Sequence, residues 1–171
     1  MLGRPSQNEY GSFYAGYVSL VPEEDCRELL LNSITELEEQ LSEIPEERSL
    51  FQYAPDKWTI LQLLQHMIDT ERIFSYRALC IARGETKPLP GFDEVDYAKA
   101  ATAEQRTLQD MKSEFIHLRK SVVYMFKSFD EESYLRMGVA SNTPVSVRAL
   151  AYMCVGHSRH HFRILRERYL V

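Results

Sequence analysis

The chain has 171 residues, of which 44% are hydrophobic and 26% are charged, and its formal net charge is −5 at pH 7. This balance is typical of a globular protein and excludes wholesale disorder and fibrous classes. The length predicts one domain over residues 1–171, which can bury enough surface to fold without disulfides. An acidic chain without a basic run is unsuited to nucleic acid, so we expect no nucleic-acid partner.

The expected location is the cytoplasm, without contact with a membrane. No apolar run approaches the roughly 18 residues that a bilayer requires. The first ten residues lack the apolar core of a signal peptide. The three cysteines are widely spaced and form no Cys-x-x-Cys pair, which predicts reduced thiols: Cys26, Cys80 and Cys154.

Residues 1–21 form a leader that is rich in aromatic side chains but has no clean period. Because such rings are unfavourable in water, we expect the leader to pack along the body of the protein or against a partner chain. A first helix is predicted to begin at Pro22, since proline suits the first helical position and three acidic residues follow it. Apolar residues at spacings of four and three predict its core-facing stripe: Leu30, Ile34, Leu37, Leu41 and Ile44.

A second helix is predicted to begin at Thr59, which has the spacing of a capping box with Gln62. It is predicted to end near Arg83, with Gly84 as the residue that terminates it. The stretch Glu85–Ala101 contains two prolines and a glycine and is predicted to be one long loop. Loops of this length in a compact domain are usually functional or mobile.

A third helix is predicted from Thr102, with Gln105 as the partner in a second capping box, to Ser128. A fourth helix is predicted from residues 145–146 to Tyr169. We find no alternating segment of convincing length for a strand. Four amphipathic helices of this length predict an all-α protein with the architecture of a four-helix bundle.

A helical projection at about 100° per residue separates the five histidines. His157 and His161 share the centre of the apolar stripe of the fourth helix, while His160 lies on its flank. His66 lies on a core-directed face of the second helix. His117 lies opposite the stripe of the third helix and is expected to be solvated. The projection therefore places three imidazoles inside the bundle.

Two histidines at positions i and i+4 direct two ring nitrogens toward one point, as metal ligation requires. Neutral imidazole suits Zn²⁺, Ni²⁺, Fe²⁺ or Cu²⁺. The alternative is that each inward histidine is a core residue hydrogen-bonded to a backbone carbonyl. Three buried imidazoles that all need partners favour the metal, although spacing alone leaves both interpretations open.

The segment from Trp58 to His66, followed by Asp69-Thr70-Glu71, resembles the second-helix signature of the DinB-like superfamily, which includes YfiT-type proteins and thiol-dependent transferases. Residues 146–150 and the motif Gly156-His157-Ser158-Arg159-His160-His161 resemble its fourth-helix signature, and residues 90–94 are similar to a loop of many members. The resemblance spans residues 22–170. It implies a bundle with an unusual helix connection, frequent homodimers and a bound divalent metal. That metal is often nickel or zinc, with Fe²⁺ and Mn²⁺ as alternatives, and its implied ligands are His66, His157 and His161.

Characterised members of this superfamily transfer or isomerise groups with low-molecular-weight thiols. Three histidine ligands leave a coordination position open and leave a dication its full charge, which lowers the pKa of a bound water or thiol. We therefore expect a thiol-dependent S-transferase or a hydrolase that acts on a small molecule. The alternative is a metal- or ligand-binding stress-response protein without turnover.

Two further residues are catalytic candidates. Asp69 is one turn from His66 and can orient an imidazole, the alternative being a solvated helix carboxylate. Arg77 lies further along the same face and can meet an anionic substrate, the alternative being an ion pair with an acidic neighbour. The acidic residues of the long loop can cap the site, bind an amine on a thiol, or simply be solvated: Asp93, Glu94 and Asp96.

Opposite charges gather on the first and fourth predicted helices. Residues 22–48 carry ten carboxylates against two arginines, and the fourth helix carries five arginines against one glutamate. These charges can meet within one chain or between chains. Because the aromatic leader also supplies apolar area suited to an interface, we expect a homodimer.

Overall fold

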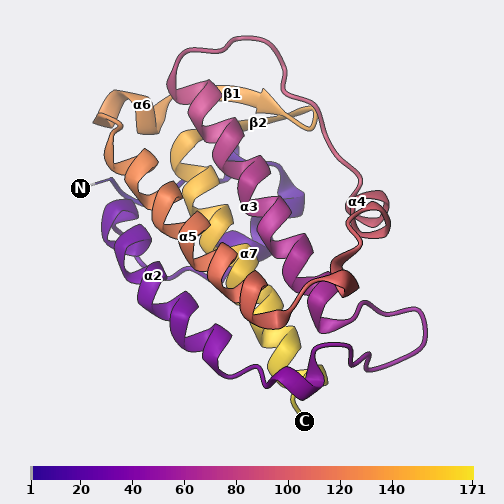
Figure 1. Cartoon of the computed structure of the whole chain (residues 1–171). Coiled ribbons are helices and arrows are strands. Elements are labelled where there is room, and N and C mark those ends of the chain that lie inside the picture. Colours follow the sequence, from indigo (N-terminus) through magenta and orange to yellow (C-terminus); the bar gives the residue numbers. More distant parts are fainter. Residues whose placement is uncertain (1) are drawn as a thin grey trace.

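Four long helices form the body of the protein, which a computed structural model describes for residues 2–171 (Figure 1). These helices are α2 (Cys26–Ser42), α3 (Ile60–Ala82), α5 (Leu108–Lys127) and α7 (Val147–Ile164). The short elements are α1 (Ala15–Ser19), α4 (Glu94–Ala100), α6 (Glu131–Leu135), and the strands β1 (Met137–Ala140) and β2 (Thr143–Ser146). The prediction of an all-α four-helix bundle is confirmed. Over residues 2–171, no helix has both the length and the apolar character needed to cross a membrane.

Side-chain caps decide where the first two long helices begin. The predicted start of α3 is confirmed, since Thr59 and Gln62 form the reciprocal bonds of a capping box. The helix stops before Gly84, whose φ of +88° is a conformation that favours glycine. The predicted start of the first helix is wrong, because α2 begins four residues after Pro22. The Asp25 side chain accepts hydrogen bonds from two backbone N–H groups of the first turn and thereby sets the N-terminus there.

The stretch Glu85–Ala101 is not one long loop, because it contains the helix α4. The Asp93 side chain caps α4 by accepting hydrogen bonds from two of its first backbone N–H groups. Ahead of α4 the chain is extended along β1, where the N–H of Leu89 donates to the carbonyl of Val139 at 2.9 Å. The segment is therefore anchored to the hairpin at one end and carries a short helix at the other.

The third long helix, α5, begins six residues after its predicted start at Thr102. Thr102 has a left-handed backbone conformation with a φ of +47°, which differs from the extended conformation of a typical N-cap. Thr107 caps the helix instead, since its hydroxyl accepts a hydrogen bond from the N–H of Asp110 at 3.1 Å. The second predicted capping box is therefore wrong.

The antiparallel hairpin of β1 and β2 is a further element that the sequence analysis does not predict. Its turn residues Ser141 and Asn142 both have a positive φ, +51° and +61°, as a tight two-residue turn requires. Strands of four residues are too short to show a convincing alternation. After the hairpin, Ser146 caps α7, and the helix continues as a π-helical turn over Leu165–Tyr169. The predicted extent of the fourth helix is thus confirmed.

The acidic N-terminal region and the basic α7 meet within one chain. Arg159 pairs with Glu23 at 2.5 Å and with Glu36 at 2.8 Å. Arg166 pairs with Glu43 at 2.7 Å. The opposite charges therefore have partners without a second chain, and the homodimer stays a prediction.

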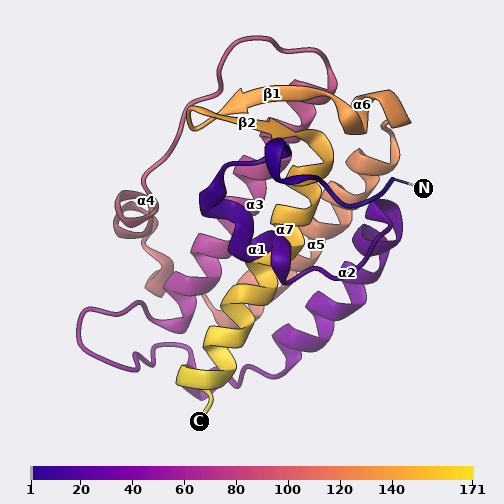
Figure 2. The same cartoon turned by 180° about the vertical axis from the view of Figure 1, so that it is seen from behind.

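The aromatic leader packs along α7 on the face seen in Figure 2. At Gly156, an ideal Cβ would lie only 2.1 Å from the carbonyl oxygen of Tyr17, so the leader backbone can approach α7 only because this residue is glycine. The Tyr17 ring packs edge-on against His157, with ring centroids 5.2 Å apart. The expectation that the leader packs along the body is confirmed.

A buried ion pair joins three of the four long helices. Arg119 of α5 donates one hydrogen bond to each carboxylate oxygen of Glu71 on α3, both at 2.6 Å, and a third to Ser158 on α7 at 2.9 Å. Arg119 is 1% exposed and Glu71 is 2% exposed. Because a buried charge needs its partner, this network holds α3 and α7 in a defined relative position.

Candidate metal centre and its pocket

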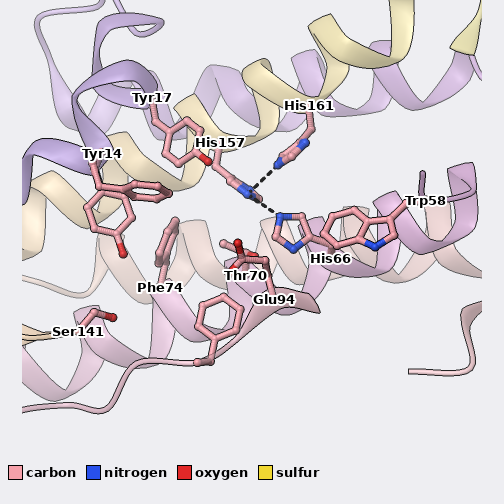
Figure 3. Close-up of a pocket in the computed structure, with 12 residues that line it drawn as sticks. Tyr14, Tyr17, Trp58, His66, Thr70, Phe74, Glu94, Ser141, His157 and His161 are labelled. Atoms are coloured by element: carbon pink, nitrogen blue, oxygen red, sulfur yellow. Dashed lines mark hydrogen bonds between the residues drawn. The ribbon is translucent and has the colours of Figure 1, made fainter. Parts of the chain in front are cut away.

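Three histidine side chains converge where α3 packs against α7 (Figure 3). The Nε2 atom of His157 lies 3.1 Å from Nε2 of His66 and 3.0 Å from Nε2 of His161. The ligand atoms of all three lie within 4.8 Å of one another. The two residues of α7 are buried and the one on α3 is half-buried.

Burial keeps these imidazoles neutral. It lowers the pKa of His66 to about 4. Burial, together with the neighbouring histidines, holds the pKa of His157 and of His161 well below the usual range. Near pH 7 each ring therefore has one nitrogen with a free lone pair, which is the state that ligates metals.

The cluster fits a metal better than a set of satisfied core histidines. A single Nε2 atom of a neutral ring can serve as donor or acceptor in one good in-plane hydrogen bond, yet that of His157 faces two other Nε2 atoms. Nitrogens that share one ion at about 2.0–2.1 Å are separated by roughly 3.0–3.4 Å, close to the observed spacing. The donor set therefore suits a divalent ion with nitrogen ligands.

A cavity of about 410 Å³ opens beside the three imidazoles. Its walls come from the leader, from α3 and the residue Trp58 ahead of it, from α7, from the segment that enters α4, and from the hairpin turn (Figure 3). Six of its lining residues outside the cluster are aromatic: Phe13, Tyr14, Tyr17, Trp58, Phe74 and Phe92. The Trp58 ring lies against His66, with centroids 4.9 Å apart. Aromatic surface next to a polar cluster is typical of small-molecule sites.

The remaining two histidines lie where the projection places them. The exposed His117 contacts its own helix, with Nδ1 2.7 Å from the carbonyl oxygen of Ser113. His160 is half-buried, and its ring contacts that of Tyr17 at a centroid distance of 5.3 Å. Neither belongs to the cluster that can hold a metal.

The two catalytic candidates lie outside the histidine cluster. Asp69 accepts a hydrogen bond from Gln65 at 2.9 Å and lies 3.6 Å from Arg72, so within the described chain its polar partners are on its own helix rather than at His66. Arg77 is 2% exposed and donates to the carbonyl of Pro90 at 2.8 Å and to Ser141 Oγ at 2.9 Å. It therefore joins α3 to the hairpin turn and to the segment before α4, instead of making the ion pair that was the alternative interpretation.

The acidic residues near α4 have three different positions. Asp93 is the cap of that helix. Asp96 is exposed and lies 4.0 Å from Lys99. Glu94 alone lines the cavity.

Sequence reasoning missed several residues of the cavity wall. Tyr14 and Tyr17 had a signal in the aromatic density of the leader, and Thr70 belongs to the second-helix signature. Ser141 had none, because it reaches the cavity through the turn of the hairpin.

The family model of the DinB superfamily matches residues 29–165. Solved structures give the same fold. YfiT from Bacillus subtilis, described as a probable metal-dependent hydrolase with an unusual four-helix bundle topology, has a TM-score of 0.72 at 13% identity, covering 95% of this chain and 89% of that one. A search of curated sequences gave no match.

Two further structures are similar at low identity. The mycothiol-dependent maleylpyruvate isomerase has a TM-score of 0.66 at 12% identity, covering 84% of this chain and 59% of that longer chain. A DinB-like protein of Bacillus subtilis, YjoA, has a TM-score of 0.56 at 19% identity, covering 83% of this chain and 90% of that one. At these identities the likeness concerns the fold.

Proposed function

The chain belongs to the DinB superfamily, and from that premise we propose that it is a divalent-metal-dependent enzyme acting on a small molecule. The observation that carries the proposal is the convergence of three neutral imidazoles at the wall of a cavity of about 410 Å³. A volume of a few hundred Å³ is typical of small-molecule sites. The descriptions of YfiT as a probable metal-dependent hydrolase and of the isomerase as mycothiol-dependent agree with this proposal.

The proposed ligands are His66, His157 and His161, and the proposed metal is Ni²⁺ or Zn²⁺, with Fe²⁺ or Mn²⁺ as alternatives. Such an ion would strongly lower the pKa of a bound water or thiol, because three neutral ligands leave the full charge of the ion in place. A cluster that opens onto a cavity, rather than one closed by a fourth protein ligand, is the arrangement of catalytic sites. This favours turnover over the alternative of a non-catalytic binding protein.

Aromatic residues pack against the imidazoles and line the cavity beside them. The rings of Tyr17 and Trp58 lie against His157 and His66, so they limit the access of bulk water to the imidazoles. The leader and the segment that enters α4 contribute aromatic rings and the Glu94 carboxylate to the cavity wall, which suits a substrate with both apolar and polar parts. Two reactions fit this arrangement: S-transfer from a low-molecular-weight thiol, and hydrolysis by an activated water.

The absorption spectrum of cobalt-substituted protein tests the proposal and separates the two reactions. Titration with small thiols should produce a saturable sulfur-to-metal charge-transfer band if the enzyme is an S-transferase. The band should be absent in the His161→Ala variant. A cobalt-loaded protein without any spectral change at millimolar thiol would eliminate thiol transfer and leave the hydrolase. Failure of the protein to bind cobalt would contradict the metal site itself.

A further inference from the structure

The polar groups of the cavity, apart from the imidazoles, define a distinct subsite. The lining residues include one carboxylate, Glu94, and two aliphatic hydroxyls, Thr70 and Ser141, but neither lysine nor arginine among the residues described. Figure 3 places Glu94 and Thr70 on the side of the cavity that faces His66 and His157. Apart from an ion held by the imidazoles, the fixed charge that these side chains present to a ligand is therefore the negative charge of Glu94.

Glu94 is free to bind a ligand. It is the first residue of α4, where Asp93 already occupies the capping position. Within residues 2–171 its carboxylate takes part in none of the ion pairs or side-chain hydrogen bonds, although thirteen ion pairs are present there. An exposed carboxylate at the rim of an aromatic cavity attracts a cation and repels an anion.

Thr70 contributes to the cavity wall a hydroxyl that is unpaired over the described residues. The residue is 3% exposed, and its Oγ1 is buried without a hydrogen-bond partner in the part of the chain that the structure describes. Buried hydroxyls are almost always paired, either with protein or with bound molecules. Because Thr70 lines the cavity, a ligand with an N–H or O–H group can supply the missing bond.

The aromatic walls add to the same preference. Tyr14, Tyr17 and Phe74 form a continuous set of rings, with Tyr14 5.9 Å from Phe74 and 6.4 Å from Tyr17 between centroids. Ring faces carry negative potential and attract ammonium groups, while they accommodate apolar groups equally well. An anionic ligand gains nothing from either the rings or the carboxylate.

We propose that this cavity binds a small protonated amine, with the ammonium group at Glu94 and Thr70 and the apolar part against the rings. The inference takes the cavity to be the substrate site of the proposed enzyme and thereby names the class of its substrate. Such a substrate carries a positively charged group that donates hydrogen bonds, and this group distinguishes it from neutral and acidic substrates.

The test is isothermal titration calorimetry on metal-free protein at pH 7 with three probes of similar shape: 2-phenylethylamine, 2-phenylethanol and phenylacetate. The amine, which is protonated at this pH, should bind about tenfold more tightly than the alcohol, and phenylacetate should bind more weakly than both. Glu94→Gln should remove most of the advantage of the amine. Thr70→Val, which preserves shape, should weaken the amine further.

Asp96→Asn is the matched control, because it makes the same change of charge on an exposed residue of the same helix. It should leave the affinity for the amine unchanged. Equal binding of amine and alcohol, tighter binding of phenylacetate, no binding of the amine at millimolar concentration, or no effect of Glu94→Gln would each overturn the proposal. Since these measurements need no metal, such a failure leaves metal binding by the histidines untouched, and a failure of metal binding leaves the amine subsite untouched.

Discussion

Replacing Gly156 by alanine tests whether the leader is a wall of the site. An alanine Cβ would lie 2.1 Å from the Tyr17 carbonyl oxygen, about 1.3 Å short of the 3.4 Å at which ordinary contact begins. Helix propensity alone predicts a gain, because glycine in a helix interior is about 1 kcal/mol less favourable than alanine. Overpacking predicts a loss of about 1–3 kcal/mol. Since the atom in the way is backbone and cannot rotate aside, we expect the loss to prevail, with a net destabilisation of up to about 2 kcal/mol.

The leader should respond before the body of the bundle does. Displacement by this amount separates the Tyr17 ring from His157 and exposes Val18, which is 2% exposed in the native protein. Urea unfolding measures the change in the free energy of unfolding, and limited proteolysis measures the accessibility of residues 2–21. Both should report a weaker contact between leader and α7.

Gly16→Ala is the control for this experiment. Gly16 is an exposed position in α1, and a Cβ there would meet no atom within 4 Å. That variant should be neutral or stabilised by up to about 1 kcal/mol. If Gly156→Ala is as stable as Gly16→Ala and its leader is equally protected, the close approach of the leader to α7 is refuted.

Four other outcomes are expected. His157→Ala should lose stoichiometric metal by elemental analysis, whereas His160→Ala should retain it; full retention in the first variant would contradict the ligand set. Arg119→Leu should lower the free energy of unfolding by about 3–5 kcal/mol, because it leaves Glu71 buried without its partner, and adding Glu71→Leu should recover part of that loss. Burial alone would raise the pKa of the Glu9 carboxyl, but hydrogen bonds from Arg148 and Ser6 outweigh the effect of burial and lower this pKa to about 2. The stabilisation by Glu9 is therefore complete above its unfolded pKa of about 4.5 and lost as the pH falls toward 2, so Glu9→Gln should differ from wild type in urea unfolding at pH 7 and converge with it near pH 2. Sedimentation should report a dimer at tens of micromolar, and a monomer at that concentration would refute the expected self-association.

The facing of the histidines could be predicted because it depends on helical periodicity alone. His157 and His161 are one turn apart on α7, and His66 lies on the face of α3 that packs against that helix. Burial of both apolar faces turns all three rings into the bundle, and the packing of α3 against α7 then brings them to the same level. Their metal remains a proposal, since periodicity places the side chains and does not identify what they bind.

Local signals failed where tertiary contacts choose between similar residues. Thr102 and Thr107 are both followed three residues later by a side chain suited to a helix N-terminus, and only Thr107 caps α5. Asp69 is a candidate for orienting an imidazole by its spacing alone, but its partners are Gln65 and Arg72, one turn away on either side. A helical projection cannot predict which of several possible partners a side chain bonds, because the choice depends on the rotamers of the neighbouring side chains.

Arg77 has a consequence for how this protein can be re-engineered. Its buried guanidinium carries both the hairpin turn and the segment that leads to α4, through Ser141 and Pro90. The three histidines thus lie on two long helices, whereas Phe92, Glu94 and Ser141 lie on short segments. Arg77 and the backbone hydrogen bonds between Leu89 and the hairpin hold those segments in place. A library that varies Phe92, Glu94 and the leader residues of the cavity, with Arg77 left intact, should therefore redirect the choice of substrate without disturbing the imidazole geometry.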